Sequence, residues 1–213
     1  MYIVIEGQDA TGKSTQVEML ADYLRAQGKE VITMHEPDGD LKSTHVLRDL
    51  IKNKEYDLEP ITHVLLFSAA RQELWRKLAE PVLKRGGYVI SARNWWSTLA
   101  YQGYGQGISR TRIIKITKEI MPDRYVNPDK SVIFTLDDKT RIARQKGRDD
   151  NSQKDTFESK SDDFQHKVDA AYLKIARDFI IPTIDASQSA DKIQLALRKI
   201  FGVYPCTNPG NPS

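Results

Sequence analysis

The chain has 213 residues, which is enough for one α/β domain with a sizeable core and at most a small appended lid. Its 32 lysines and arginines nearly balance 29 aspartates and glutamates, leaving a formal net charge of +3 without the long basic block of a non-specific nucleic-acid binder. Cys206 is the only cysteine, which excludes an intrachain disulfide, and no hydrophobic run approaches the roughly 18 residues of a membrane helix, so we expect a cytoplasmic protein that binds neither nucleic acid nor membrane.

Short apolar runs alternate with helical stretches along the chain. The runs that predict buried parallel strands are residues 2–5, 31–34, 88–91, 131–136 and 180–184. This alternation implies βαβ units, and therefore a three-layer α/β domain with a parallel five-stranded sheet flanked by helices and ligands at the carboxyl ends of the strands. We expect a single domain over residues 1–203, with a polar flap beginning near residue 137 and a proline-containing disordered tail over residues 204–213.

The first predicted strand leads into a glycine-rich turn of eight residues. Gly7-Gln8-Asp9-Ala10-Thr11-Gly12-Lys13-Ser14 satisfies the P-loop pattern G-x-x-x-x-G-K-[ST], and residues 16–26 then carry apolar side chains at helical spacing. Backbone N–H groups of such a turn converge on phosphate oxygens, and the helix that follows adds the positive end of its dipole. We expect Lys13 to reach the β and γ phosphates of ATP and Ser14 to ligate Mg²⁺. The residues predicted to bind ATP are Gly7, Ala10, Thr11, Gly12, Lys13, Ser14 and Thr15.

Four segments of the chain carry a more specific signal than the P-loop alone. They are Ile5-Glu6-Gly7-Gln8-Asp9, Glu36-Pro37-Asp38-Gly39, Leu66-Phe67-Ser68-Ala69-Ala70-Arg71 and Leu99-Ala100-Tyr101-Gln102-Gly103. In this order and spacing, residues 1 to 185 resemble thymidylate kinases, of the bacterial type with a basic lid. The resemblance implies a P-loop nucleoside monophosphate kinase fold with a helical lid. It also implies the conversion of ATP and dTMP to ADP and dTDP, in dTTP synthesis, by a homodimer.

The resemblance also implies roles for individual residues in the acceptor site. Asp9 matches the carboxylate that holds the sugar 3′-hydroxyl, and Arg48 matches the arginine that binds the monophosphate. Phe67 corresponds to the ring that stacks on thymine, and Arg71 lies four residues on, so that a helix places both on one side of the base. The alternatives are that Asp9 is a helix-start acid, Arg48 a solvated helix arginine and Phe67 a core aromatic, the last being favoured for Phe67 when the resemblance is left aside. The predicted substrate-binding residues are Asp9, Glu36, Pro37, Arg48, Phe67, Arg71, Arg93, Thr98, Tyr101 and Gln102.

A basic lid is implied after the fourth predicted strand, at about residues 141–158. Its cations are Arg141, Arg144, Lys146 and Arg148, followed by Asp155, Phe157 and Glu158. Because Ala10 and Thr11 put no arginine inside the P-loop, we expect the lid to supply charge to the transferring phosphoryl group, with Arg148 as the preferred residue and Arg144 beside ATP. The alternative is a solvated, salt-bridged helix face. The predicted catalytic residues are Lys13, Asp9, Arg93 and Arg148.

One segment departs from the family pattern. The family has Asp-Arg after its third strand, whereas this chain reads Ser91-Ala92-Arg93-Asn94-Trp95-Trp96, so that a negative charge is missing where Mg²⁺ is expected. Three explanations stay open: an engineered substitution, an enzyme that recruits another carboxylate, and a nucleotide-binding relative with little turnover. Trp95 and Trp96 either reshape the acceptor pocket or simply pack, so a kinase of another pyrimidine deoxynucleoside monophosphate, such as dUMP, also stays open.

The remaining candidates for chemistry are the histidines. His35, His45, His63 and His166 show no metal-ligand spacing with one another or with Cys206, which favours surface or packing roles. Phosphoryl transfer needs no nucleophilic triad, because alignment and charge neutralisation carry the catalysis and the acceptor phosphate is itself the nucleophile. Asp9 is therefore expected to orient the nucleotide and not to act as a general base.

Overall fold

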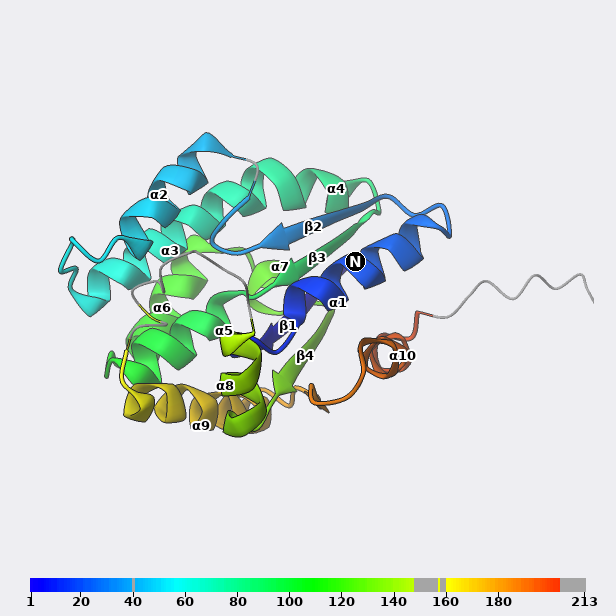
Figure 1. The fold of residues 1–213 in the computed structure, drawn as a ribbon. Coiled ribbons are helices and arrows are strands. Elements are labelled where there is room, and N and C mark those ends of the chain that lie inside the picture. The colour runs from blue at the N-terminus through cyan, green and yellow to red at the C-terminus, as the bar shows by residue number, and fades with distance from the viewer. Residues whose placement is uncertain (40, 148–156, 158–159, 204–213) are drawn as a thin grey trace, which may run out of the picture.

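A five-stranded parallel sheet forms the middle layer of the computed structural model, which describes residues 1–39, 41–147, 157 and 160–203 (Figure 1). The strands follow the order β2-β3-β1-β4-β5, so that β1 and its P-loop lie at the centre. This confirms the predicted fold class. The strands are β1 (Tyr2–Gly7), β2 (Val31–His35), β3 (Tyr88–Ala92), β4 (Lys130–Thr135) and β5 (Thr183–Asp185).

Helices cover both faces of the sheet. One face carries α1 (Lys13–Arg25) and α10 (Ala190–Phe201), which also pack on each other. The helices whose buried side chains join the core of the other face are α2 (Lys42–Lys52), α3 (Pro60–Leu74), η1 (Trp75–Ala79), α4 (Glu80–Lys84), α5 (Trp95–Thr98), η2 (Leu99–Gly105), α6 (Arg110–Ile120), α7 (Asp123–Val126) and α9 (Asp162–Asp178). α8 (Asp138–Lys146) follows β4. No helix in the described part of the chain is both long enough and apolar enough to cross a membrane.

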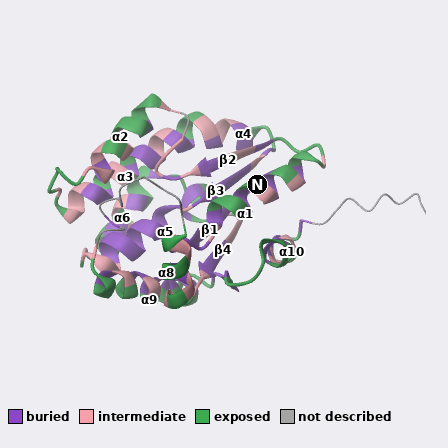
Figure 2. Ribbon diagram, in the orientation of Figure 1, coloured by how far each residue is buried: buried purple, intermediate pink, exposed green. Residues whose placement is uncertain are grey.

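The hydrophobic core is split into two layers by the sheet. On β1 the side chains of Ile3 and Ile5 join the cluster under α1 and α10, whereas Tyr2 and Val4 join the cluster on the opposite face. Alternate residues of a strand point to opposite faces, so a strand covered on both sides is apolar throughout. Figure 2 shows the result, with buried residues concentrated on the strands and on the inner sides of the helices.

The turn between β1 and α1 depends on two glycines. Gly7 has φ +135°, and a Cβ built on it would lie 2.5 Å from the backbone oxygen of Phe134, so only glycine fits. Gly12 has φ +82° and directly precedes α1. α1 begins at Lys13, within the P-loop motif, and continues through the apolar side chains at helical spacing.

The last strand differs from the sequence-based prediction. β5 runs over Thr183–Asp185, although the apolar run begins at Ile180. Ile180 has φ +53° and its side chain is 92% exposed, so this residue belongs to a turn after α9. Pairing with β4 begins at Pro182, whose carbonyl accepts a hydrogen bond from Ile133 N at 3.0 Å.

Candidate active site

A cleft of about 870 Å³ opens at the carboxyl ends of the strands, where ligands bind in this class of fold. It brings together most of the predicted site residues: Asp9, Ala10, Gly12, Lys13, Ser14, Glu36, Pro37, Arg48, Phe67, Arg71, Arg93, Thr98, Tyr101 and Gln102 line it. A second hollow of about 280 Å³ is lined by Thr11, Thr15 and Arg144, together with Ala10 and Gly12 of the same loop. Gly7 ends β1 behind the loop.

The P-loop offers a phosphate group two kinds of positive charge, the ammonium group of Lys13 and the N-terminus of α1. The ammonium group of Lys13 donates to the Gln8 carbonyl at 2.5 Å, which folds the lysine over the loop. The first turn of α1 contains no acidic side chain, so the positive end of its dipole is not neutralised within the helix. Ser14 is exposed in that turn and lines the cleft, so its hydroxyl is available to a cation held by phosphates.

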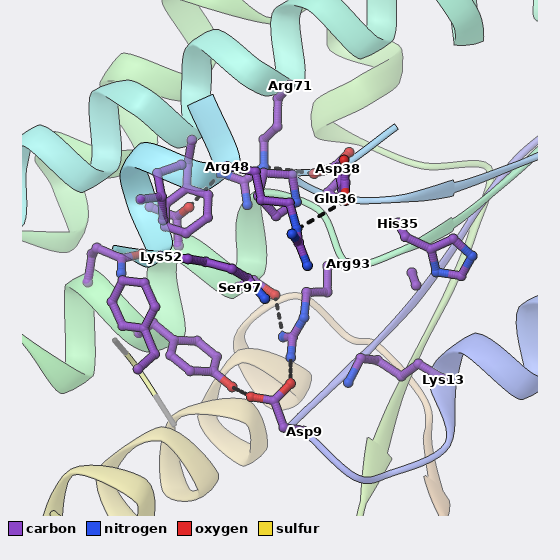
Figure 3. A pocket seen from close by; sticks show the side chains of 18 of the residues that line it. Asp9, Lys13, His35, Glu36, Asp38, Arg48, Lys52, Arg71, Arg93 and Ser97 are labelled. Carbon is purple, nitrogen blue, oxygen red and sulfur yellow. Dashed lines mark hydrogen bonds and ion pairs between the residues drawn. The ribbon is translucent and has the colours of Figure 1, made fainter. Parts of the chain in front are cut away.

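Asp9 is held in the cleft by two partners. Its Oδ1 forms an ion pair with Nη2 of Arg93, and its Oδ2 accepts a hydrogen bond from the Tyr101 hydroxyl at 3.0 Å (Figure 3). Burial by itself would raise the pKa of Asp9, but the charges of Arg93 and Lys13 hold it well below its usual range. Asp9 is therefore an ionised hydrogen-bond acceptor at neutral pH.

Arg93 is fixed by a buried carboxylate that sequence reasoning missed. Arg93 has φ +76°, an uncommon conformation for a side chain with a Cβ, and its Nη1 donates to Ser97 Oγ at 3.0 Å and Tyr172 OH at 3.1 Å. Both hydroxyls donate to Glu6 Oε2, at 2.8 and 3.1 Å, and Glu6 Oε1 accepts the Asn94 N–H at 2.7 Å. The sequence offered one indication of this role, since Glu6 is an acidic residue inside an otherwise apolar strand. A fully buried carboxylate needs hydrogen-bond partners, so its presence there predicts polar groups packed around it.

Arg71 lies at the back of the cleft, almost completely buried. Its Nε donates to Glu36 Oε2 at 2.7 Å, its Nη1 to Thr98 Oγ1 at 2.6 Å, and its Nη2 to the Asn94 carbonyl at 2.8 Å. These bonds use three of the five N–H groups of a guanidinium. The guanidinium carbon lies 5.3 Å from the centre of the Phe67 ring, so the ring and the arginine share one wall as predicted.

Glu36 lines the back of the cleft and faces Arg71. Its side chain is fully buried and also accepts hydrogen bonds from the Tyr125 hydroxyl, at 3.1 and 2.9 Å. Burial raises the pKa of Glu36 to about 7, against the opposing effect of Arg71 and Tyr125. The arrangement makes Glu36 a support for Arg71, which the sequence pattern could not distinguish from direct contact with the substrate.

Arg48 reaches the cleft from α2 with a partner that the sequence analysis did not assign. Its Nε lies 3.0 Å from Asp38 Oδ2, and His45 Nε2 lies 3.4 Å from the other oxygen of that carboxylate. The Arg48 side chain is 35% exposed, so its remaining donors stay accessible. Figure 3 shows Arg48 beside Asp38, on the wall across from Asp9.

The structure describes the predicted lid at residues 141–147 and at Phe157. Arg144 Nη1 lies 3.5 Å from the Ala10 carbonyl, next to the P-loop, whereas Arg141 is buried and donates to Asp138 at 2.9 Å. Arg148, Asp155 and Glu158 lie outside the described residues. Phe157 is described and lines the cleft, with its ring centre 6.0 Å from those of Phe67 and Tyr101.

His166 belongs to a group that linear spacing did not reveal. Its Nδ1 lies 2.9 Å from Asp138 Oδ2, and a carboxylate oxygen of Asp169 completes a set of ligand-type atoms within 4.8 Å of one another. His166 and Asp169 lie on α9, and Asp138 begins α8, so the group exists only after the two helices meet. The guanidinium of Arg141 already supplies a positive charge to Asp138 there.

The two tryptophans after Arg93 pack and do not shape the cleft. Trp95 and Trp96 are 2% and 4% exposed, and both rings contact Phe179 at the end of α9. The Trp95 indole N–H donates to the Val126 carbonyl at 3.1 Å. Neither tryptophan is among the described residues that line the cleft, so of the two interpretations left open by the sequence the packing role is the one observed.

Comparisons with known proteins agree with this geometry. The sequence pattern of the family described as Thymidylate kinase matches residues 5–197. The chain is 32% identical to a thymidylate kinase of Thermosipho africanus, covering 94% of this chain and 96% of the relative, and 36% identical to one of Chlorobium luteolum, covering 82% and 83%. A crystal structure of thymidylate kinase from Ehrlichia chaffeensis superposes with a TM-score of 0.74 at 26% identity, covering 95% of this chain and 98% of that one. The chain therefore belongs to the thymidylate kinase family.

Proposed function

We propose that the cleft described above carries out the reaction of this family, the transfer of the γ-phosphoryl group of ATP to dTMP. Family membership is the observation that carries the assignment, because the match spans nearly all of the chain. The protein accordingly phosphorylates dTMP, with ATP as the phosphoryl donor. The roles of individual residues are our proposal, and each is argued below from its contacts.

The donor phosphates bind over the P-loop. The open backbone at Gly12, the ammonium of Lys13 and the uncompensated N-terminus of α1 together form an anion site. Thr15 and Arg144 line the adjoining hollow, which suits the remainder of the ATP molecule. The exposed hydroxyl of Ser14 fits Mg²⁺, a hard cation that would neutralise charge on the β and γ phosphates.

The acceptor nucleotide binds on the opposite wall. Phe67 offers a ring face for the base, and Arg71 retains N–H groups beside it. Gln102 supports a polar contact with the base, because its buried Nε2 has no hydrogen-bond partner among the described residues and it lines the cleft. Arg48 has accessible donors for the monophosphate, and Asp9 has an ionised carboxylate for a sugar hydroxyl.

Positive charge converges between the two nucleotides. In Figure 3 the side chains of Lys13 and Arg93 both reach toward Asp9. We place the attacking and leaving oxygens of the in-line transfer beside these two cations. Stabilising charge on the transferring group is the main catalytic term in phosphoryl transfer. We assign this role to Lys13 and Arg93 within the described cleft, and to Arg148 from the predicted lid.

The assignment is tested by coupled measurement of ADP release with a panel of acceptors. We expect dTMP-dependent release, with dTMP preferred over dUMP by about tenfold or more, because one methyl group in an apolar pocket is worth that much. Lys13→Met should abolish turnover, whereas Lys29→Met, an exposed lysine after α1, should not. A tenfold preference for another acceptor would contradict the assignment to dTMP, and saturable binding of both nucleotides without ADP release would indicate an impaired relative.

We further propose that the protein is a cytoplasmic homodimer with one kinase domain per chain. Family membership supports the dimer, as do the exposed apolar side chains of Val46 on α2 and Leu65 on the adjoining α3. Light scattering coupled to size exclusion should give a mass about twice the 24.3 kDa of the chain. A mass equal to that of one chain at micromolar concentration would contradict the dimer.

A further inference from the structure

Ala92, which stands where the family pattern has an aspartate, has a well-defined position in the structure. Ala92 ends β3 with its side chain on the α1 face of the sheet, in the same cluster as Val17 and Leu20 of that helix. It is 4% exposed and lines the cleft together with Ser14. A carboxylate that acts near the donor phosphates must therefore come from another element that reaches this corner.

His35 and Glu18 meet at that corner. His35 is the residue of β2 directly paired with Ala92 of β3, so their side chains lie on the same face of the sheet. The Nε2 of His35 lies 3.2 Å from Oε1 of Glu18 on α1. Figure 3 shows the His35 ring on the α1 side of the cleft, near Lys13 and away from Arg71.

Glu18 lies one helical turn beyond Ser14. Residues four apart on a helix are neighbours on one face, with about 5–6 Å between their Cβ atoms, and helical side chains lean toward the N-terminus. The Glu18 side chain is 48% exposed and that of His35 is 41% exposed, so both are accessible to solvent, and His35 lines the cleft. Helix geometry thus brings a carboxylate toward the hydroxyl that fits Mg²⁺.

Three of the acidic side chains that line the cleft are already paired with arginines. Asp9 pairs with Arg93, Glu36 with Arg71, and Asp38 with Arg48. Glu55 also lines the cleft, on the segment after α2, which Figure 1 places far from α1. Among the contacts described for Glu18, the partner is an imidazole, which does not carry the permanent charge of a guanidinium.

We infer that Glu18, positioned by His35, supplies the carboxylate that organises the Mg²⁺–nucleotide complex in place of the acid absent at position 92. This deepens the proposed function and rests on it, since it concerns the metal used with ATP. The carboxylate of Glu18 attracts the cation that would lie beside Ser14. The imidazole of His35 holds that carboxylate in its orientation. The chain thereby retains one negative charge at this corner, carried by α1 instead of β3.

The test measures how strongly Mg²⁺ and nucleotide assist each other in binding. Calorimetry gives the affinity of the intact protein for a non-hydrolysable ATP analogue, once with Mg²⁺ and once with EDTA, and the ratio of the two affinities is the coupling. Glu18→Gln should reduce this ratio about tenfold while the affinity in EDTA is unchanged, because loss of a group that orients a metal typically costs that much. Asp22→Asn, the same charge change one turn further along α1, should leave both affinities unchanged.

Two further variants distinguish a metal-organising role from a surface ion pair. Ala92→Asp combined with Glu18→Gln should restore the coupling to within about threefold of wild type, because the charge returns from β3. His35→Ala should weaken the coupling in the wild-type background but have no added effect with Glu18→Gln, as expected of a residue that acts through Glu18.

The outcomes separate this inference from the proposed function. A metal-dependent wild type with an unaffected Glu18→Gln variant overturns the inference and leaves the function intact. A double variant that stays as weak as Glu18→Gln overturns it as well. If wild type binds the analogue equally in Mg²⁺ and in EDTA, the use of Mg²⁺ in the proposed function fails and the inference fails with it.

Discussion

Arg93 illustrates how single residues of this cleft are held before any ligand arrives. Its backbone adopts φ +76°, and its guanidinium contacts Asp9, Ser97 and Tyr172. Conformations of this kind in non-glycine residues cluster at functional sites, where the surrounding structure enforces them. The enforcing group here is Glu6, which binds the Asn94 N–H and the Ser97 hydroxyl. The hydrogen bonds that Glu6 accepts offset the free-energy cost of burying its carboxylate, and they also hold the groups that fix Arg93.

Arg93→Lys is the residue-scale test of this pre-organisation. We expect turnover to fall by about 100-fold, because a lysine cannot reproduce the planar fork that bridges Asp9 and the transferring group. The KM for ATP should change little, and steady-state kinetics with dTMP measures both quantities. Arg25→Lys, at an exposed ion pair on α1, serves as the control. Turnover within threefold of wild type would show that Arg93 acts only as a point charge.

Phe67→Ala tests the base-binding wall. Stacking of a base on an aromatic ring is worth about 1–3 kcal/mol, so the KM for dTMP should rise at least about fivefold. The KM for ATP should not change, because Phe67 lies on the wall across from the P-loop. Leu195→Ala, at a 64% exposed position of α10, is the control. An unchanged KM for dTMP would assign Phe67 to the core.

At the scale of elements, the cleft depends on how α5 and η2 continue from β3. Asn94 caps α5 by accepting the Trp96 N–H, and the helix then widens to a π-helix over Leu99–Gly105. Such segments are frequent at functional sites, because the wider turn re-aims side chains. Here it contains Tyr101 and Gln102, both of which line the cleft. Trp95 and Trp96 anchor the start of this segment against α9.

The contact between α8 and α9 predicts that the stability of the protein depends on pH. Burial raises the pKa of Asp169 to about 7, with Asp138 adding to the shift and Arg141 opposing it. Because the folded state then binds this proton more tightly than the unfolded chain, the free energy of unfolding falls as pH rises from about 4 to about 7. Asp169→Asn removes the effect, so it should stabilise the protein by about 1 kcal/mol at pH 8, after allowance for solvent screening, and not at pH 4.

Urea unfolding at the two pH values measures this difference. Asp163→Asn, an exposed position of the same helix, should leave the pH dependence unchanged. If Asp169→Asn destabilised the protein equally at both pH values, Asp169 would contribute through its hydrogen bond with Asp138 and not through the pH-dependent binding of a proton.

At the scale of the whole molecule, the two proposed substrate sites are built from different parts of the chain that meet at the cleft. The proposed donor site lies on the P-loop and α1, whereas the proposed acceptor site lies on α2, α3 and η2. A ligand that binds only the folded state raises the free energy of unfolding by RT ln(1 + [L]/Kd). Each substrate therefore stabilises the complete fold and not only its own wall.

Thermal unfolding measures this linkage. A non-hydrolysable ATP analogue or dTMP at about 100 times its Kd should each add about 2.7 kcal/mol, which corresponds to a rise of roughly 5–10 °C in Tm for a domain of this size. Arg48→Met should reduce the shift with dTMP and leave the shift with the analogue unchanged. A shift with dTMP that is unaffected in that variant would place the acceptor phosphate elsewhere.

Most residues of the cleft were predicted from a family resemblance, whereas the sequence by itself determined the sheet and the P-loop. Each of these depends on residues that are close together in the chain: the apolar runs predict strands, and the spacing from Gly7 to Ser14 determines the phosphate cradle. The positions of Phe67 and Arg71 on one wall follow from helical periodicity alone. Local geometry is enough for such features, because backbone stereochemistry decides them.

Only the tertiary structure decided which groups pair. Glu6 and Asn94 are 88 residues apart, and Arg71 and Glu36 are 35 apart, so no spacing rule predicts their hydrogen bonds. The packing of Trp95 against Phe179, the contact of His166 with Asp138, and the meeting of Glu18 with His35 beside Ala92 are of the same kind. A buried or partly buried polar group takes the partner that the fold brings near it, and that choice depends on the relative placement of whole helices and strands.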